Sequence, residues 1–469
     1  MVKRKISNFI IILTGICLLF SCSDMIYREN LTGNWEQIGY GRIIKIDSTK
    51  YSYYNFTENS CNILVEGELS ERFKLVRHND DTLVLNPGGI VNYYFTKSKK
   101  LPQNCLQMDS SNNRNILLNF NDFWKTFDEN YAFFDQRNID WKEIYREYKP
   151  QVDTIKTSKE LYSIFKEISG NFSDGHIKLD VPDTIKASSK QSKPMVQVPT
   201  KNDIQRDIME NYIDDPKQYN NGVIKWGTLK NSRTGYIQIS DMNNFANYVK
   251  EKSITEKAFY EKYKQQKSRI GALEYFEDEI SGVNYIMKQI LSDLKDTNPV
   301  IIDLRFNGGG YERIALEILS YFVDKTKHAI SVSAKTKDGN SPEQKIILEP
   351  KGDIYEGQVY LLTSDATASA AEIFALASMQ YPDKIFRIGS STNGIFSEIL
   401  WKQLPIGWEY SLSNEIYSDP EGKIYEIDGV PCNIDMNYPI KREDFYNSFY
   451  KANIFTDETL EMFIKRKTP

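Results

Sequence analysis

Short alternating apolar and polar segments dominate the chain from residue 31 to about residue 100. Polar or glycine-rich turns separate them, the clearest being Asn86-Pro87-Gly88-Gly89. Alternation with period two, interrupted by turns of this kind, predicts antiparallel strands. We therefore expect a small β-barrel or sandwich domain over residues 31–112. No set of acid, base and nucleophile is recognisable here, so we interpret the domain as a spacer or recognition module.

The periodicity changes to that of helices near residue 113. Aromatic side chains recur at positions i, i+3, i+4 and i+7, namely Phe120, Phe123, Trp124 and Phe127. This spacing predicts one face of an amphipathic helix, and such a stripe is more often core than a ligand site. Two further helices are predicted before a polar turn that contains His176. We expect residues 113–185 to form a helical subdomain that carries this histidine.

The polar segment 186–232 predicts a linker and long loop. From Gly235 onward, strand-like and helix-like patterns alternate, which predicts an α/β core with mainly parallel strands over residues 233–445. The last segment, 446–469, predicts a tail with a terminal surface helix.

Composition and charge exclude several classes of function. There are 59 basic and 64 acidic residues, with no dense basic block, so nucleic acid is not expected as a partner. Only three histidines occur, and the cysteine spacing matches no zinc motif, so we expect no metal and no cofactor. In an exported protein Cys61 can pair with Cys105, which leaves Cys432 free.

The first residues predict export. Three basic residues at positions 3–5 precede an apolar stretch over residues 9–20, which is too short for a membrane span and suits a signal peptide. The sequence Leu-Phe-Ser-Cys ending at Cys22 resembles a bacterial lipobox. The alternative is an ordinary signal peptide with an incidental cysteine. We expect a signal peptide over 1–21, lipidation of Cys22, a tether over 22–30, and a soluble body anchored in the bacterial cell envelope, facing the periplasm or the cell surface.

Two strand-to-helix junctions are candidates for chemistry. In the first, an apolar strand runs into Asn307-Gly308-Gly309-Gly310, whose backbone amides can bind an anion or a developing oxyanion. The absence of G-x-G-x-x-G disfavours a dinucleotide. In the second, Ser369 stands at the first turn of an Ala-rich helix. From spacing alone, simple turn geometry and helix capping remain the commoner interpretations of these two features.

A family resemblance favours the chemical interpretation. Residues 303–310 (Asp-Leu-Arg-Phe-Asn-Gly-Gly-Gly), followed by residues 367–372 (Thr-Ala-Ser-Ala-Ala-Glu), resemble the C-terminal processing peptidase and tricorn family of serine peptidases. The match extends to Ile139-Asp140-Trp141, Ser173-Asp174-Gly175-His176 and Gly429-Val430-Pro431. It implies a spiral sheet of the ClpP and crotonase type, and peptide hydrolysis through an acyl-enzyme.

The family uses two catalytic arrangements. The processing branch pairs its serine with a lysine in a Thr-x-Gly-Lys turn. Here the corresponding turn reads Thr392-Asn393-Gly394-Ile395, and an isoleucine cannot accept a proton. Lys384 and Lys402 lie out of register. A Ser–Lys dyad is therefore disfavoured.

The tricorn-like branch uses a histidine and a glutamate, and both have counterparts in this chain. The resemblance implies that Ser369 is the nucleophile, that His176 is the general base and acid, and that Glu426 orients the imidazole. Glu398 and Asp428 are alternatives for the orienting carboxylate. A structural histidine at the start of a strand is the alternative interpretation of His176.

The amides of Gly309 or Gly310 and of Ala370 would form the oxyanion hole. Tricorn itself has a serine just before the histidine and an aspartate just after the nucleophile. Gly175 and Ala370 stand there instead, which puts tricorn-like substrate preferences in doubt. No PDZ-like segment is recognisable between His176 and Gly235.

Two functions follow from these features. The first is a lipid-anchored serine peptidase acting on a peptide or protein. The alternative is a catalytically inactive binding protein on the same fold, recognising a peptide, glycan or lipid. Retention of His176 and Glu426 at the matching positions favours the peptidase.

Overall fold

A computed structural model describes most of the chain. The described residues are 31–58, 60–106, 113–186, 198–251, 254–452 and 454–465. The predicted signal peptide, Cys22 and the tether lie outside them. None of the helices within these ranges combines the length and the apolar character needed to cross a membrane.

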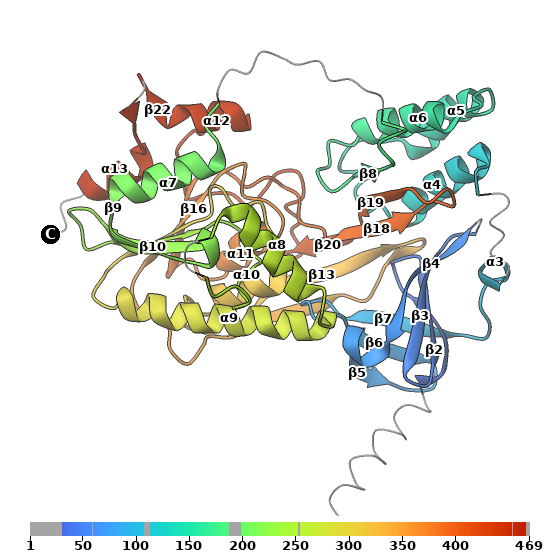
Figure 1. The fold of residues 1–469 in the computed structure, drawn as a ribbon, viewed down its shortest axis with the longest axis horizontal. Helices are drawn as coiled ribbons and strands as arrows, with labels where there is room; N and C mark the ends of the chain where they lie inside the picture. The colour runs from blue at the N-terminus through green and yellow to red at the C-terminus, as the bar shows by residue number, and fades with distance from the viewer. Residues whose placement is uncertain are drawn as a thin grey trace, which may run out of the picture.

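Seven strands form an antiparallel sheet at the N-terminal end of the described chain (Figure 1). They run over Gly33–Gln37 (β1), Arg42–Asp47 (β2), Lys50–Phe56 (β3), Cys61–Glu68 (β4), Lys74–His78 (β5), Thr82–Asn86 (β6) and Tyr93–Ser98 (β7). Their order is β4-β3-β2-β1-β7-β6-β5, and the short helix α2 (Leu69–Arg72) connects the two edge strands. The predicted antiparallel strands are confirmed. Their pairing gives one sheet, with no β4–β5 pairing among the described residues.

A helical layer follows the short helix α3 (Gln103–Leu106). It consists of α4 (Ile116–Asn130), α5 (Trp141–Val152) and α6 (Ser158–Gly170). Phe120, Phe123 and Phe127 on α4 are fully buried, as expected for a core stripe. They share a hydrophobic cluster with Trp35 of the N-terminal sheet and Tyr410 of a three-stranded sheet. That sheet contains β8 (Leu179–Asp180), β18 (Ile399–Gln403) and β19 (Glu409–Ser413).

The centre of the molecule is a second seven-stranded sheet, part of a mixed α/β fold. Its strands run over Ile213–Tyr219 (β9), Ile224–Leu229 (β10), Gly235–Ile239 (β11), Val300–Asp303 (β12), Val359–Thr363 (β16), Ile385–Gly389 (β17) and Ile434–Asp435 (β21). The order is β21-β17-β16-β12-β11-β10-β9. The five strands from β21 to β11 are parallel, and β10 and β9 continue the sheet antiparallel.

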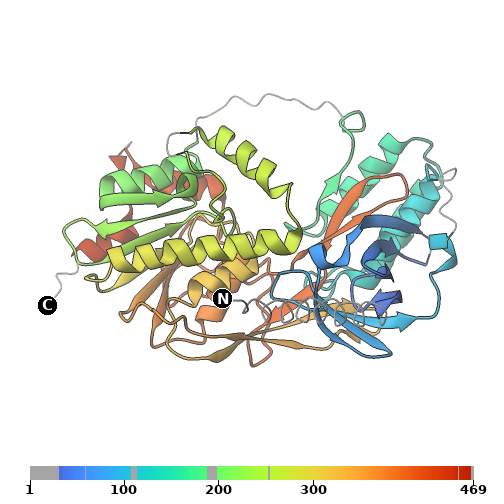
Figure 2. The same ribbon diagram turned by 60° about the horizontal axis from the view of Figure 1, so that its bottom comes forward.

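Helices cover both faces of this sheet (Figures 1 and 2). They are α7 (Lys201–Tyr212), α8 (Glu256–Lys267), α9 (Ala272–Asp293), α10 (Glu312–Leu319), α11 (Ala370–Ser378), α12 (Arg442–Ser448) and α13 (Glu458–Lys465). On β12, Val300 and Ile302 pack with residues of α9, α10 and α11, whereas Ile301 packs with residues of α7, α12 and α13. This alternation is expected for a strand buried on both sides.

The smaller elements complete the structure. They are β13 (Lys327–Thr336), β14 (Gly339–Asn340), β15 (Gln344–Leu348), β20 (Glu415–Ser418), the hairpin β22 (Tyr450–Lys451) and β23 (Ile454–Phe455), and the short 3₁₀ helix at Asn220–Gly222.

The prediction of a linker and long loop over 186–232 is wrong from residue 201 onward. This stretch forms α7, β9 and β10, and β10 pairs directly with β11. Its polar composition has a physical cause, because α7 is a surface helix and β9 is the edge strand of the sheet. Only one face of α7 is apolar, with Ile204 and Ile208 fully buried.

The C-terminal tail is more buried than expected. A terminal helix is present, but Leu460 on α13 is fully buried and Asp457, just before it, is 1% exposed. The tail therefore belongs to the core on the α7 side of the central sheet.

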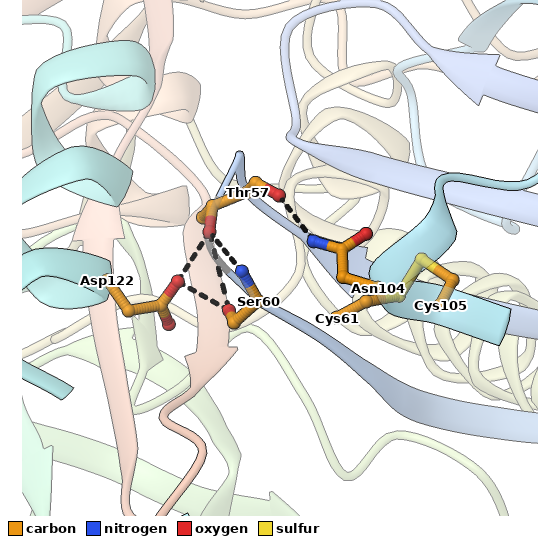
Figure 3. Close-up of a disulfide and its surroundings, with 6 residues drawn as sticks. All are labelled: Thr57, Ser60, Cys61, Asn104, Cys105 and Asp122. Carbon is orange, nitrogen blue, oxygen red and sulfur yellow. Dashed lines mark hydrogen bonds between the residues drawn. A yellow bond between two sulfur atoms is a disulfide. The ribbon is translucent and has the colours of Figure 1, made fainter. Parts of the chain in front are cut away.

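A disulfide joins Cys61 at the start of β4 to Cys105 on α3, as the sequence allowed (Figure 3). Beside it, the hydroxyls of Thr57 and Ser60 both donate hydrogen bonds to Oδ1 of Asp122, at 2.5 Å each. Asp122 lies on α4 and is buried. The disulfide-linked corner of the N-terminal sheet is thus fixed directly to the helical layer.

Candidate active site

The two candidate junctions lie at the same edge of the central sheet. The glycine turn follows β12 and Ser369 follows β16, and these neighbouring strands are parallel. Carboxyl ends of parallel strands meet at one edge, where α/β proteins commonly bind ligands. The two segments are in contact, because a methyl group built on Gly309 would lie 2.7 Å from Cβ of Ser369 and 2.8 Å from the carbonyl oxygen of Ala368.

Ser369 has an unusual backbone conformation. Its φ is 56° and its ψ is −126°, a region that non-glycine residues rarely occupy and that costs about 1–3 kcal/mol. It immediately precedes α11 and is half-buried. A strained turn between a strand and a helix presents a serine hydroxyl in the same way in other hydrolases. Ordinary helix N-caps have an extended backbone, so capping alone does not explain the conformation of Ser369.

Glu372 holds this turn in place. Its fully buried carboxylate accepts hydrogen bonds from the amides of Ser369 (3.0 Å), Gly394 (2.6 Å) and Ile395 (2.8 Å) and from the hydroxyl of Thr392 (2.6 Å). Burial raises the pKa of Glu372 to about 7, although these four donors favour its ionised form. Glu372 therefore ties α11 to the segment 392–395. The sequence motif contained this glutamate but indicated no role for it.

Two of the three predicted oxyanion-hole amides are available. The Gly309 amide donates to Oδ1 of Asn307 at 2.9 Å and is therefore occupied. The amides of Gly310 and Ala370 have no hydrogen-bond acceptor within the described part of the chain. Asn307 also donates from Nδ2 to the carbonyl of Ile239 at 3.0 Å, so its side chain fixes the turn at two points.

His176 is 7% exposed, and its backbone is fixed on both sides. Its amide donates to Oδ1 of Asp174 at 2.9 Å, and its carbonyl accepts from the Ser411 hydroxyl at 2.6 Å. The buried Nδ1 has no hydrogen-bond partner among the described residues. Burial lowers the pKa of the imidazole to about 4, while Asp174 acts in the opposite direction. The ring is therefore neutral near pH 7, as a general base must be.

Glu426 is buried and is bound by groups other than His176. Oε1 accepts from Nη2 of Arg137 at 2.8 Å, and Oε2 accepts from the amide of Phe396 at 3.0 Å. Burial raises the pKa of Glu426 to about 8, although the Phe396 amide and the Arg137 guanidinium lower it. Arg137 also donates to the carbonyl of Ser173 at 2.8 Å. Arg137, which the sequence did not indicate, thus joins Glu426 to the loop that carries His176.

The three predicted catalytic residues converge on one short segment. The Ser369 amide donates to the carbonyl of Ile395 at 3.1 Å, and the next residue along, Phe396, binds Glu426. A methyl group built on Gly175, the neighbour of His176, would lie 2.8 Å from Cδ1 of Ile395. Ile395 stands where the processing branch of the family has lysine. No hydrogen bond between described residues joins the His176 ring to Ser369 or Glu426.

The two alternative carboxylates lie elsewhere. Asp428 is exposed. Glu398 lies with Glu312 and Glu415, and oxygens of the three carboxylates are within 4.8 Å of one another. Within the described residues this is the group suited to a cation, but Glu415 is hydrogen-bonded to the hydroxyls of Tyr40 (2.5 Å) and Tyr417 (2.7 Å).

A cavity of about 370 Å³ lies beside the glycine turn. Tyr311 and Glu312, which directly follow Gly310, form part of its wall. Residues of the N-terminal sheet domain, among them Arg72, Ile90 and Tyr93, line another part of it, and the rest comes from the end of α8, the start of α9 and Glu398. The N-terminal sheet domain therefore contributes to a cavity next to the candidate oxyanion hole.

Comparison with known proteins identifies the domain. Residues 233–436 match peptidase family S41, and residues 115–170 match the tricorn protease C1 domain. The chain contains a serine peptidase domain of family S41. The predicted resemblance is thus confirmed, and the S41 match contains both the glycine turn and Ser369.

One solved structure gives the same indication for the fold, and two others are similar over much of the chain. A putative peptidase from Parabacteroides merdae is 20% identical, with a TM-score of 0.51 over 68% of this chain and 88% of that one. Mature CPAF in complex with lactacystin is 11% identical, with a TM-score of 0.49 over 75% and 98%. Tricorn protease is 14% identical, with a TM-score of 0.36 over 91% and 44%. The first likeness shows a shared fold.

Proposed function

We propose that the S41 domain hydrolyses peptide bonds through an acyl-enzyme formed on Ser369. The observation that carries this proposal is the strained backbone of Ser369, packed against Gly309 with the amides of Gly310 and Ala370 unoccupied beside it. A carbonyl oxygen that accepts from these two amides becomes more electrophilic at carbon, and the amides stabilise the negative charge that develops there.

His176 is the proposed general base and acid. It takes the proton of the Ser369 hydroxyl as Oγ attacks the carbonyl carbon, and returns it to the amine that leaves. A water molecule then hydrolyses the ester with the same proton transfers in reverse order. Burial favours the neutral ring that starts this cycle. Catalytic hydrogen bonds are often completed only when substrate binds, so the step requires the ring to approach Ser369.

Glu426 is the proposed orienting carboxylate. Its link to His176 runs through Arg137, which binds both Glu426 and the carbonyl of Ser173. Replacement of Glu426 leaves a buried guanidinium without its acceptor and loosens the loop that carries His176. We expect its loss to cost less activity than the loss of Ser369 or His176.

The cellular setting is a further proposal. A basic start, a short apolar stretch and Cys22 support a lipoprotein anchored in the bacterial cell envelope. The Cys61–Cys105 disulfide supports the same location, because disulfides persist in oxidising compartments. The family resemblance supports a central sheet of the ClpP and crotonase type. The proposed divisions 31–112 and 113–185 are kept, whereas the α/β core, predicted over 233–445, begins at α7 and includes the C-terminal tail.

The deciding experiment uses the protein that starts after Cys22, incubated with a mixed peptide library and analysed by mass spectrometry. Ser369→Ala and His176→Ala should each lower kcat on the order of 10³-fold or more, because the residues act as a unit. Cleavage that persists in Ser369→Ala would exclude the assigned nucleophile. Absence of cleavage in every form would favour the alternative of a binding protein.

A further inference from the structure

A completely buried charge cluster lies beneath the catalytic edge of the central sheet. Nη2 of Arg305 contacts Oδ2 of Asp303 at 2.6 Å and Oδ2 of Asp457 at 2.7 Å, and Nη1 contacts Oδ1 of Asp457 at 3.1 Å. The side chains of all three residues are 0–1% exposed. Asp457 therefore binds the guanidinium with both oxygens, which is the strongest geometry for such a pair.

The two aspartates come from different parts of the chain. Asp303 lies two residues from Arg305 at the end of β12, so this contact is local. Asp457 lies 152 residues away, in the C-terminal tail and outside the matched S41 region. Two further hydrogen bonds hold Asp457. Its amide donates to the hydroxyl of Tyr212 at the end of α7 at 2.9 Å, and its Oδ1 accepts from the amide of Leu460 in the tail at 3.1 Å.

The guanidinium is fully charged in this cluster. Burial by itself lowers its pKa, but the two carboxylates raise the pKa of Arg305 well above its usual value. Tyr236 donates to Oδ2 of Asp303 at 2.7 Å, and the Tyr438 hydroxyl accepts from Nη1 at 3.3 Å. Removing Asp457 would leave half of the guanidinium without its main acceptor in a place that excludes water.

The backbone at Arg305 carries the loop of the nucleophile. The Arg305 carbonyl accepts from the Ser364 hydroxyl at 2.6 Å, and the neighbouring Leu304 carbonyl accepts from the Thr367 hydroxyl at 2.8 Å. The Asn307 carbonyl accepts from the amide of Ala368, the residue before the nucleophile, at 3.1 Å.

The same short segment carries the other half of the site. The Asn307 side chain holds the Gly309 amide, which fixes the glycine turn next to Gly310. A displacement of the backbone over residues 304–307 would therefore move the nucleophile loop and the oxyanion-hole turn relative to each other. Through its guanidinium, Arg305 ties that backbone to Asp457 in the C-terminal tail.

We propose that Asp457 is a positioning residue for catalysis: by binding Arg305 from the C-terminal tail, it fixes the strand end that sets the distance between Ser369 and the oxyanion-hole amides. This inference rests on the proposed peptidase function. It extends the catalytic unit to a tail that lies outside the matched family region. A misplacement of about 1 Å in such a site can cost on the order of 10²-fold in rate.

The test uses a fluorophosphonate probe, which needs no knowledge of the natural substrate. The Ser369 oxygen bonds to phosphorus, fluoride leaves, and the hydroxyl proton passes to the base. The rate of labelling at Ser369 is followed by mass spectrometry in the wild type and in Asp457→Asn. Where a cleaved peptide is known, kcat and KM are measured as well. We expect labelling and kcat to fall about 10-fold or more in Asp457→Asn, with KM nearly unchanged. Asp457→Glu, which keeps the charge, should recover part of the rate.

Two matched variants separate positioning from stability. Phe463→Ala removes a buried side chain of the same tail that has no contact with the charge cluster among the described residues, so it should lower Tm and leave the labelling rate below Tm unchanged. Asp444→Asn removes an exposed carboxylate of α12, just before the tail, and should change neither.

Each outcome has a definite meaning. Labelling of Asp457→Asn at the wild-type rate would overturn the inference and leave Asp457 a purely structural residue. If Asp457→Asn does not fold, Tyr438→Phe decides, because it leaves Asp457 in place and removes the weaker acceptor of Nη1, together with the hydrogen bond of the same hydroxyl to Thr459. An unchanged labelling rate in that variant overturns the inference, and a reduced rate with unchanged KM supports it. A wild-type protein that is not labelled at Ser369 would instead contradict the proposed function.

Discussion

Gly308 and Gly309, neighbours in the turn after β12, differ in how closely other atoms pack against them. Gly309 has a φ of +108° and touches Ser369, Ala368 and Ala370, so a methyl group there would contact them at 2.7–3.1 Å. Gly308 has no atom within 4 Å of the corresponding position. The turn therefore needs glycine at Gly309 for two reasons, conformation and close approach.

We predict that Gly309→Ala displaces Ser369 and disables the site. The free energy of unfolding should fall by about 1–3 kcal/mol, from backbone strain and overpacking. The rate of peptide cleavage should fall on the order of 10²-fold. Gly308→Ala is the matched control and should retain both stability and activity. Urea unfolding and kcat measurements check the pair, and equal activity in the two variants would contradict the close packing seen here.

His176 should make stability depend on pH in a particular direction. Its folded-state pKa of about 4 lies below the ordinary value of 6.5, so the folded state favours the neutral ring. Its stabilising contribution is complete above pH 6.5 and is lost as the pH falls from 6.5 towards 4. The loss is on the order of 3 kcal/mol.

Denaturant unfolding of the wild type and His176→Gln between pH 4 and 7 measures this effect, and the variant should show a weaker loss. The acid limb of kcat/KM should correspondingly have a midpoint well below 6.5. A midpoint at 6.5 or above would show that the ring is more solvated than the structure indicates.

Sequence identified some of these residues and missed others for a clear reason. Ser369 and the glycine turn lie within short local motifs, so the family resemblance could single them out although their spacing alone could not. The Arg137–Glu426 pair spans 289 positions and the Arg305–Asp457 pair spans 152. No local pattern marks an arginine as the partner of a carboxylate so far away. The partners of buried charges are set by the packing of distant elements.

At the scale of elements, hydrophobic periodicity predicted most helices and strands, but it did not reveal the surface helix α7 or the edge strand β9. Helix α4 buries a broad aromatic stripe, and its pattern was clear. Strand β9 is an edge strand with a largely exposed surface, and it contains Pro216. Edge strands need few apolar residues and tolerate proline, which makes them resemble loops in sequence.

The Cys61–Cys105 disulfide should stabilise the element pair β4 and α3. It closes a separation of 44 residues, for which the loss of chain entropy predicts a contribution of about 2–4 kcal/mol. We predict that the free energy of unfolding of the double variant Cys61→Ser with Cys105→Ser is lower by this amount, so that it unfolds at a lower urea concentration. Cys432→Ser, which touches no disulfide, should unfold like the wild type. A dithiothreitol effect on the wild type that is absent in the double variant confirms the assignment.

At the scale of the whole molecule, buried hydrogen bonds attach the N-terminal sheet to the peptidase part of the chain. Lys402 on β18 is 3% exposed, and its Nζ donates to the carbonyls of Tyr40 (2.6 Å) and Gly41 (2.8 Å) between β1 and β2. Nδ2 of Asn414 donates to the carbonyl of Gly39 at 3.0 Å. The hairpin between β1 and β2 is therefore held by donors from the peptidase side, and the sheet is built into the body of the protein. This attachment is stronger than a simple spacer requires.

We predict that Lys402→Met loosens this attachment. The two backbone carbonyls lose their shared donor while remaining buried, which should cost about 2–4 kcal/mol of stability. Because the loss falls at the contact between the N-terminal sheet and the rest of the chain, limited proteolysis should release a fragment containing β1 to β7 from the variant much faster than from the wild type. Lys345→Met, on the exposed side of β15, is the control and should be cut like the wild type. If the sheet is released equally fast from all three proteins, Lys402 does not hold it, and the contacts of the disulfide-linked corner with α4 would be the next to test.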